Sequence, residues 1–136
     1  MNVRYAEGSD LEIISAHDAH ISREELSCSI SRNRVFLAEE NGEFLGWMRY
    51  SLFWDNTPFL NMLFLLERWR GQGAGRRMMT VWESEMKALG YRLIMTSTAS
   101  NECAQHFYEK LGYRAVGSFL PDGEPLELIF SKILSP

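Results

Sequence analysis

A glycine-rich turn is the first feature of the sequence that can do chemistry. Residues 70–75 read RGQGAG; they follow a hydrophobic run, 59–66, and open an amphipathic stretch that continues to about residue 89. Glycine has no Cβ, so the backbone N–H groups of such a turn can approach an anion closely. The first turn of the following helix adds unpaired donors and the positive end of its dipole. The turn therefore indicates a phosphate site.

Basic side chains gather around this turn. Four arginines, Arg68, Arg70, Arg76 and Arg77, stand near one acid, Glu67, in a chain whose formal net charge is -4. This local basicity departs from the composition of the rest of the chain and favours a polyphosphate ligand.

The spacing of the glycines separates three kinds of phosphate loop. A dinucleotide fingerprint, GxGxxG, would need a third glycine at Arg76, and the P-loop string GxxxxGK followed by Ser or Thr occurs nowhere in the chain. What remains is RxxGxG, with Arg70, Gly73 and Gly75 at its fixed positions. An ordinary strand-to-helix turn stays open as the simpler alternative, because glycine turns are common between elements.

A second motif lies downstream of the turn. It consists of Asn101, Ala104 and the run 107–113, FYEKLGY, which contains Tyr108. These residues suit a helix, because Asn101 can cap its N-terminus, the apolar side chains share one face and Gly112 fits the position after its C-terminus. A capped amphipathic helix does not explain why Tyr108, whose hydroxyl needs a partner, stands on that face.

The two motifs, in this order, resemble the coenzyme A loop and the second half-motif of the GNAT acyltransferase superfamily, over roughly residues 59–113. The resemblance implies an α/β domain of mixed α+β order, with a twisted mixed sheet of about six or seven strands flanked by about four helices. Its central strands would splay apart to admit the pantetheine arm. The implied activity is N-acetyl transfer from acetyl-CoA to a primary amine, by direct attack in a ternary complex.

The resemblance also implies which residues bind the donor. N–H groups from about Gln72 to Arg76 would receive the pyrophosphate, with Arg70 and Arg76 near its charged end. Backbone groups at the end of the preceding strand would pair with the pantetheine amides, and Leu65 would contact the oxyanion of the thioester carbonyl. The implied donor-binding residues are Leu63, Phe64, Leu65, Arg70, Gly71, Gln72, Gly73, Ala74, Gly75, Arg76, Asn101, Ala104 and Tyr108.

The catalytic residues follow from the same resemblance. Tyr108 is in the position where the family's general acid commonly sits, and it would protonate the departing thiolate. Many relatives carry a glutamate as base on the strand before the loop, but residues 59–66 contain no carboxylate. The base is therefore unassigned, with Asp55, Glu24, His20 or a water chain as candidates. Trp54 with Asp55 is the expected acceptor-recognition element, because an aromatic face and a carboxylate suit a cation.

Two other functions stay open at this point. The missing strand glutamate motivates a catalytically silent coenzyme A-binding sensor or interaction module, which would bind the donor without turnover. A generic nucleotide or phosphate binder would use the loop alone and would bind ATP or NAD comparably. The motif from Asn101 to Tyr113 argues against this third function.

The elements that must position these residues are predicted from periodicity and turn chemistry. Strands are expected at 2–6, 35–40, 43–53, 59–65, 92–98, 113–118 and 126–133, with a type I′ turn at Asn41 and Gly42. Helices are expected at 10–20, 22–31 and 75–89, followed by the one that begins near Asn101. One apolar stripe of the third helix comprises Met78, Met79, Trp82, Met86 and Leu89, and Gly90 ends that helix.

Composition limits the remaining possibilities. A chain of 136 residues that is 46% hydrophobic suits a single domain, 1–136, with one core. Neither a membrane span of about 18 apolar residues nor a secretory signal is found, so a cytoplasmic protein without membrane association is expected. Cys28 and Cys103 are expected to be buried or partly buried thiols, and no metal is expected, because His17 and His20 lack a third ligand.

The expected partner is an amine. The mildly acidic balance, with 18 acidic and 14 basic residues, argues against general nucleic-acid binding and permits a cationic acceptor. A small-molecule or peptide amine fits this balance. The resemblance also allows a homodimer, because dimers are frequent among similar proteins.

Overall fold

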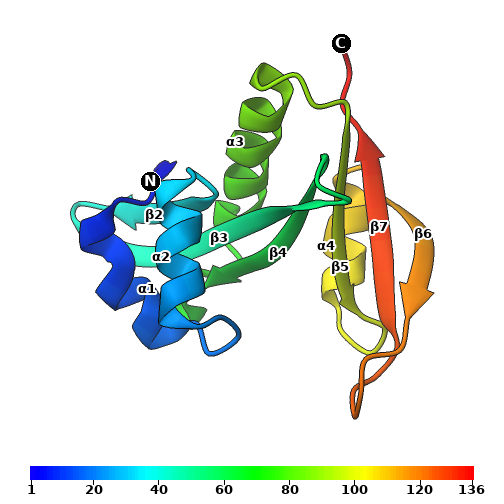
Figure 1. Ribbon diagram of the computed structural model, residues 1–136, viewed down its shortest axis with the longest axis horizontal. Coiled ribbons are helices and arrows are strands. Elements are labelled where there is room, and N and C mark those ends of the chain that lie inside the picture. Colours follow the sequence, from blue (N-terminus) through cyan, green and yellow to red (C-terminus); the bar gives the residue numbers. More distant parts are fainter. The chain divides into compact units, whose positions relative to one another are not determined.

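The computed structural model describes the whole chain, residues 1–136, and Figure 1 shows its helices and strands. The strands are β1 (Asn2–Tyr5), β2 (Val35–Glu40), β3 (Glu43–Phe53), β4 (Thr57–Leu65), β5 (Leu93–Ala99), β6 (Arg114–Phe119) and β7 (Glu127–Ile133). The helices are α1 (Leu11–His17), α2 (Arg23–Ser31), α3 (Ala74–Ala88) and α4 (Ala104–Lys110), with 3-10 turns η1 (Gly8–Asp10) and η2 (Glu67–Trp69). None of these helices is both long enough and apolar enough to cross a bilayer.

The seven strands form one mixed sheet in the order β1-β2-β3-β4-β5-β7-β6. Pairing is antiparallel from β1 to β2 and β2 to β3, parallel from β4 to β5, and antiparallel from β5 to β7 and β7 to β6. This arrangement, with its four α-helices, confirms the mixed α/β fold expected from the sequence.

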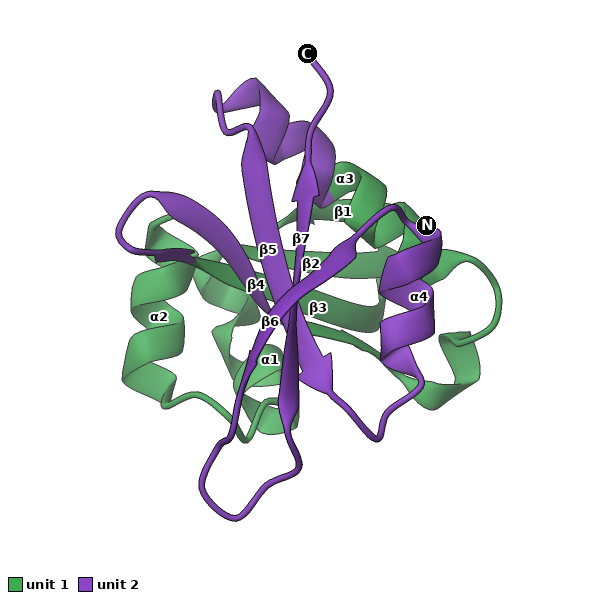
Figure 2. Cartoon of the chain, turned by 90° about the vertical axis from the view of Figure 1, so that its right-hand side faces the viewer, with its two compact units in different colours: residues 1–51, 62–81 green, residues 52–61, 82–136 purple.

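The chain divides into two compact units (Figure 2). Unit 1 comprises residues 1–51 and 62–81, and unit 2 comprises residues 52–61 and 82–136. Both β4 and α3 contribute residues to each unit. The glycine-rich turn belongs to unit 1 and Tyr108 belongs to unit 2, while a single domain over 1–136 stays a prediction.

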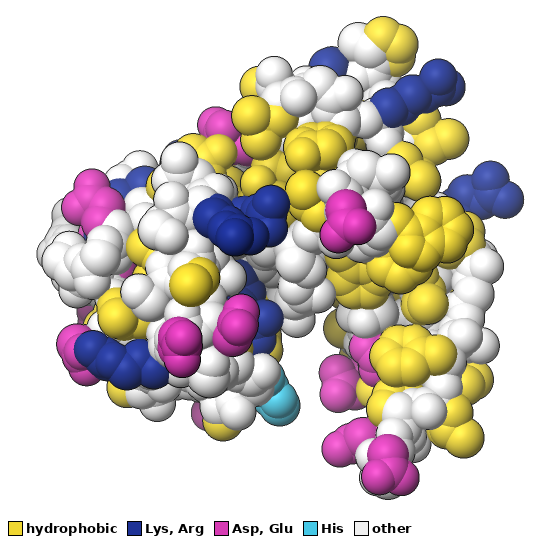
Figure 3. All heavy atoms as spheres, in the orientation of Figure 1, with side chains coloured by type: hydrophobic (Ala, Val, Ile, Leu, Met, Phe, Trp, Pro, Cys, Tyr) yellow, Lys and Arg dark blue, Asp and Glu magenta, His cyan; other side chains and the backbone are white.

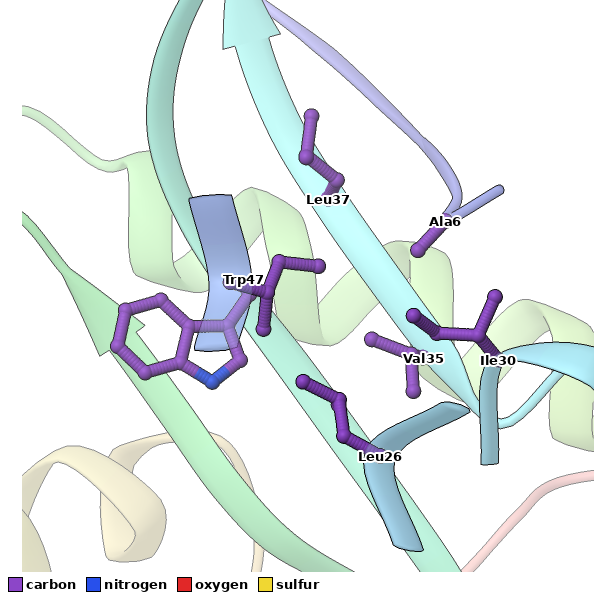
Figure 4. Packing of buried hydrophobic residues seen from close by; sticks show 7 residues of the cluster. Ala6, Leu26, Ile30, Val35, Leu37 and Trp47 are labelled. Atoms are coloured by element: carbon purple, nitrogen blue, oxygen red, sulfur yellow. The ribbon is translucent and has the colours of Figure 1, made fainter. Parts of the chain in front are cut away.

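The core of unit 1 is formed by α1, α2 and the first strands (Figure 4). Alternate positions along β2 send Val35 and Leu37 into this core, as a strand with one face on a core requires. Leu26 and Ile30, one helical turn apart on α2, meet them there. Trp47 from β3 completes the cluster, and its side chain is 1% exposed.

The predicted hairpin between β2 and β3 is confirmed. Asn41 and Gly42 adopt positive φ angles of 52° and 78°, as a type I′ turn requires. Ser22 caps α2 as expected, because its side chain accepts a hydrogen bond from the Glu25 N–H at 3.1 Å.

Unit 2 surrounds β5 with strands and covers it with helices. Trp82 and Met86 from α3, Ile94 from β5 and Phe130 from β7 are each at most 1% exposed. Outside this core, large apolar side chains face solvent, and they are frequent on the right of the face in Figure 3. They include Leu93, Val116, Phe119, Leu120, Leu126 and Ile133.

Two helix predictions are wrong in their limits. The helix expected over 10–20 ends at His17, because Asp18 turns into an extended conformation and its side chain accepts a hydrogen bond from the His20 N–H at 3.1 Å. Asn101 does not cap α4, which begins at Ala104. The Gln105 side chain closes the preceding turn by donating to the carbonyls of residues 100 and 102.

Three burial predictions are also wrong. Leu89 lies one residue past the end of α3 and is 58% exposed, although the other four members of its stripe are buried. Cys28 and Cys103 are both exposed free thiols rather than buried ones. Cys28 lies on the side of α2 away from Leu26 and Ile30, and Cys103 lies in the turn before α4.

Candidate functional site

The glycine-rich turn contains two glycines in the left-handed region of backbone conformation. Gly71 and Gly73 adopt φ angles of 74° and 82°, a region that side chains rarely allow. The Arg77 N–H donates to the Gly73 carbonyl at 3.1 Å and so closes the first turn of α3. The N–H groups that precede it at the start of this helix have no intrahelical acceptor, and they form the positive end of the helix dipole.

The arginines around the turn have different surroundings. Arg68 forms an ion pair with Glu43 of β3. The spacing of residues along the sequence does not predict this pair. The side chain of Gln72 donates to the Arg68 carbonyl at 2.9 Å and braces the turn. Arg76 and Arg77, on the first turn of α3, are exposed. Of the four arginines, these two therefore stand nearest to the helix N-terminus with their side chains in solvent.

Arg70 folds back onto β4. Its Nε donates a hydrogen bond to the Leu65 carbonyl at 2.9 Å, and its guanidinium carbon lies 4.9 Å from the centre of the Phe64 ring. The first residue of the RxxGxG motif thus holds the end of the strand that precedes the turn. Its predicted position near the charged end of a pyrophosphate stays a prediction.

The backbone at Phe64 approaches β3 closely. The Phe64 carbonyl oxygen lies 2.1 Å from the point where a Cβ on Gly46 would stand, so only glycine fits at position 46. In a trans peptide the C=O and the next N–H point in opposite directions. The Leu65 N–H is therefore directed away from β3, which is the orientation that its predicted contact with an oxyanion requires.

A buried ion pair ties the segment after α1 to β3. The Asp18 side chain is fully buried and accepts hydrogen bonds from Arg49 Nε at 2.8 Å and from Trp47 Nε1 at 3.0 Å. The ring of His17 lies 5.1 Å from Phe44 and 6.1 Å from Trp47. No pattern in the sequence predicts this cluster, because Asp18 is about thirty positions from Trp47 and Arg49 and meets them only in the folded sheet.

The charge of Asp18 is stabilised where it lies. Burial by itself would raise the pKa of this carboxyl, but the hydrogen bonds from Arg49, the His20 N–H and Trp47, together with the Arg49 charge, hold the pKa below its usual value. Asp18 is therefore ionised at neutral pH, and it is no candidate for a general base because its buried oxygens are engaged by Arg49 and Trp47. It fixes the segment that carries His20.

Tyr108 is held by aromatic packing in unit 2. Its ring centre lies 5.3 Å from Phe107, 5.6 Å from Tyr113 and 6.2 Å from Phe130, and the residue is 7% exposed. Burial raises the pKa of its hydroxyl, a hydrogen bond with the Thr96 side chain lowers it, and the charge of Glu102 raises it; the net direction is upward. Tyr108 therefore keeps its proton at neutral pH.

Thr96 links Tyr108 to β4. Its Oγ1 donates to the Leu60 carbonyl at 3.1 Å, in the parallel register where Leu60 lies opposite Thr96. Sequence reasoning missed Thr96, since a threonine inside a strand of high β-propensity carries no separate signal.

The neighbouring tyrosine has a different role. The Tyr113 hydroxyl donates to Glu83 Oε2 at 2.7 Å, and the other oxygen of Glu83 accepts from Lys132 Nζ at 2.9 Å. Burial and the adjacent Glu83 charge raise the pKa of Tyr113 far above its ordinary value. Its proton is committed to a structural network, so Tyr108 is the better candidate for a proton donor.

Trp54 and Asp55 form the turn between β3 and β4. Their φ angles are 56° and 64°, and backbone hydrogen bonds close the turn from Asp55 to Leu52 and from Asn56 to Phe53. This conformation is costly for a tryptophan. Trp54 is nevertheless 79% exposed, with its ring stacked on Phe53 at 5.1 Å.

The candidate bases are not distinguished by their surroundings. Asp55 lies in the turn just described, Glu24 lies in the first turn of α2, and His20 follows α1; all three are exposed. No cluster of three or more His, Cys, Asp or Glu side chains is arranged to hold a metal ion.

The predicted site residues thus fall into two groups. Unit 1 brings Leu63, Phe64 and Leu65 together with the turn 70–76, through the contacts of Arg70. Unit 2 contains Asn101, Ala104 and Tyr108, together with the Trp54 and Asp55 turn. Asn101 and its neighbours up to Cys103 form an exposed turn before α4.

Comparison with known proteins gives consistent results. The model of the Acetyltransferase (GNAT) family matches residues 5–113, whereas no curated protein sequence matches the chain. Among solved structures, Ard1 from Thermoplasma volcanium superposes with a TM-score of 0.86 at 13% identity, covering 99% of this chain and 98% of that one.

Two further structures show the same fold. The ribosomal-protein-S18-alanine N-acetyltransferase from Escherichia coli has a TM-score of 0.83 at 20% identity, covering 99% of this chain and 94% of its own. The PaiA N-acetyltransferase from Thermoplasma acidophilum, solved in complex with coenzyme A, has a TM-score of 0.80 at 17% identity, with coverages of 97% and 98%.

Proposed function

Because the chain belongs to the GNAT family of acetyltransferases, we propose that it transfers an acetyl group from acetyl-CoA to a primary amine by direct attack in a ternary complex. The observation that carries the proposal is the turn 70–76, with two glycines at positive φ leading directly into the N-terminus of α3. Its N–H groups receive the pyrophosphate of the donor, and the exposed Arg76 adds positive charge.

The end of β4 binds the thioester. Backbone groups of the segment Leu63, Phe64 and Leu65 that face away from β3 and are not bonded to Arg70 pair with the pantetheine amides, and the Leu65 N–H stabilises the oxyanion that forms when the amine nitrogen bonds to the acetyl carbon. A fixed donor of this kind contributes about 3 kcal/mol to lowering the barrier, because it needs no reorganisation during the reaction. The orientation of the Phe64 carbonyl toward Gly46 supports this role.

Tyr108 protonates the leaving group. When the carbon–sulfur bond breaks, the Tyr108 hydroxyl gives its proton to the coenzyme A sulfur, and the phenolate later regains a proton from solvent. An unperturbed tyrosine has a pKa of about 10 and a thiol about 8.5, so this transfer is uphill and depends on close alignment. The raised pKa keeps Tyr108 protonated when the donor binds, and it makes the transfer depend still more on that alignment.

The amine must lose a proton to become a nucleophile. An ammonium with a pKa of about 10.4 is neutral only about once in 10³ to 10⁴ molecules at pH 7. Asp55, Glu24, His20 and a water chain are all retained as routes for this proton. The general base therefore stays unassigned.

Trp54 and Asp55 recognise the acceptor in this proposal. The exposed indole offers a face to a cation, and the carboxylate beside it offers a charge partner. The acceptor is a small-molecule or peptide amine; one structural neighbour is named for acetylating a ribosomal protein alanine, which keeps peptides among the candidates. A cytoplasmic location, the absence of a nucleic-acid partner and a homodimer stay predictions.

Thermal unfolding with equal concentrations of acetyl-CoA, ATP and NAD tests the donor site. Acetyl-CoA at about 100 times its dissociation constant should stabilise the fold by about 2.7 kcal/mol and raise the midpoint by several degrees, with ATP and NAD giving less. Equal shifts with all three ligands would reduce the turn to a general anion site. No shift at millimolar concentration would contradict the donor assignment altogether.

An amine panel with detection of released thiol then tests turnover. Free polyamines, amino acids, aminoglycosides and short peptides with different first residues should separate by kcat/KM. Donor binding without thiol release from any amine would favour the silent coenzyme A-binding module instead.

A further inference from the structure

The Arg70 side chain makes two contacts with β4. The Nε–H is committed to the Leu65 carbonyl at 2.9 Å, and the guanidinium lies over the Phe64 ring at 4.9 Å. Both acceptors of these contacts belong to the segment that the proposed function assigns to the thioester. The contacts therefore connect the phosphate turn to the place where the bond chemistry occurs.

The peptide between Leu65 and Leu66 is held on both sides. Its carbonyl accepts from Arg70, and its N–H donates to the Leu45 carbonyl of β3 at 2.9 Å. A peptide held at both ends restrains the ψ angle of Leu65, and the Phe64 carbonyl above Gly46 orients the preceding peptide, whose N–H belongs to Leu65. Arg70 provides the only one of these two restraints that comes from outside the sheet.

The Phe64 side of the segment is restrained by packing. The Phe64 carbonyl fills the space above Gly46. The Phe64 ring contacts Trp47, at 5.1 Å between ring centres, and the Arg70 guanidinium. Since Trp47 is buried and hydrogen bonded to Asp18, it is a rigid support on one side. The Arg70 guanidinium, 4.9 Å from the ring centre, is the second contact of the ring.

We propose that Arg70 is a positioning residue for acetyl transfer: it holds the Phe64–Leu66 backbone so that the Leu65 N–H meets the oxyanion, in addition to any contact with phosphate. The inference rests on the proposed function. It makes Arg70 matter for a donor that has no phosphate groups at all, which a phosphate-binding arginine would not.

A truncated donor separates the two roles. Turnover is measured with acetyl-CoA and with S-acetylpantetheine, which lacks the pyrophosphate, for the wild type, Arg70→Met, Arg70→Gln and the control Arg76→Met. Arg70→Met should lower kcat with S-acetylpantetheine by about tenfold to a hundredfold, because displacing the Leu65 N–H by about 1 Å has an effect of that size. Arg70→Gln, which keeps an N–H donor without the charge, should recover part of the loss.

The control variant defines the opposite behaviour. Arg76→Met should raise the KM for acetyl-CoA and have little effect on kcat with S-acetylpantetheine, because that donor has no phosphate and the exposed Arg76 side chain lies on the first turn of α3. If Arg70→Met matches the wild type with S-acetylpantetheine while losing activity with acetyl-CoA, Arg70 acts only on phosphate and the inference is overturned.

A second measurement does not depend on activity. Amide hydrogen exchange at Leu66 should be about tenfold faster in Arg70→Met than in the wild type, and closer to the wild type in Arg70→Gln. Unchanged exchange would overturn the inference even where activity falls. If the wild type turns over neither donor with any amine, the proposed function fails, and the exchange rates alone decide whether Arg70 holds β4.

Discussion

The two units hold their candidate residues by different means. In unit 1 the polar groups around the site are engaged in directional contacts: Asp18 with Arg49 and Trp47, and the Leu65 carbonyl with Arg70. In unit 2, Tyr108 is held mainly by ring packing, and Trp54 projects from an exposed turn. In unit 1, hydrogen bonds therefore hold the backbone of the candidate site in place. In unit 2, the candidate residues Tyr108 and Trp54 would act through their side chains.

The same substitution in each unit gives the largest expected contrast. Asp18→Asn should lower the free energy of unfolding by about 3–5 kcal/mol, because it leaves the Arg49 charge buried without its partner. Asp55→Asn, in the exposed turn of unit 2, should change it by less than about 0.5 kcal/mol. Urea unfolding of both variants measures the difference. Equal losses would remove the distinction between the units.

Tyr108→Phe should affect chemistry rather than stability. Loss of the general acid should lower kcat by about 10²-fold or more, while donor binding measured by thermal shift persists. The matched control is Tyr113→Phe, which removes the hydrogen bond to Glu83 and should lower the melting midpoint without a comparable loss of kcat. If both variants lose kcat equally, the distinction between the two tyrosines is wrong.

The buried carboxylate of unit 1 should make stability depend on pH. The pKa of Asp18 is lower in the folded state than in the unfolded state, so its stabilisation is present above the unfolded pKa of about 3.9 and is lost as pH falls through the folded value. Each unit of pKa difference corresponds to about 1.4 kcal/mol. Unfolding midpoints of the wild type from pH 7 to pH 2 should fall more steeply below pH 4 than those of Asp18→Asn. Parallel curves would contradict the assignment.

The Trp54–Asp55 turn should lower the stability of the fold while it helps to bind the acceptor amine. Replacing Trp54 and Asp55 by Asn and Gly places residues that tolerate positive φ at both positions, so the free energy of unfolding should rise by about 1 kcal/mol. The KM for the amine should rise, while the KM for acetyl-CoA stays unchanged. A stabilised variant with an unchanged amine KM would show that the turn does not contact the acceptor.

Local chemistry made much of the fold predictable. The Asn41–Gly42 turn, the Ser22 cap and the buried stripe from Met78 to Met86 depend on residues close in sequence, and the structure confirms them. The end of α1 and the start of α4 were predicted wrongly, because the side chains of Asp18 and Gln105 make hydrogen bonds that stop or delay a helix. Propensity contains no information about such contacts.

The candidate site was predictable to the extent that it is local. The glycines of the turn are recognisable in the sequence alone. The contacts of Asp18 with Arg49 and of Thr96 with Leu60 depend on the folded sheet. Gly46 is an intermediate case. A glycine inside a strand is a known sign of close backbone approach, but only the structure identifies the Phe64 carbonyl as the group that approaches.

The two exposed thiols allow distances within this chain to be measured without added cysteines. Cys28 belongs to unit 1 and Cys103 to unit 2, and neither is paired. Spin labels or fluorophores attached to the native cysteines would report the separation of the units in solution without any engineered site. A distance distribution recorded before and after addition of acetyl-CoA would then show whether donor binding changes the distance between the two thiols.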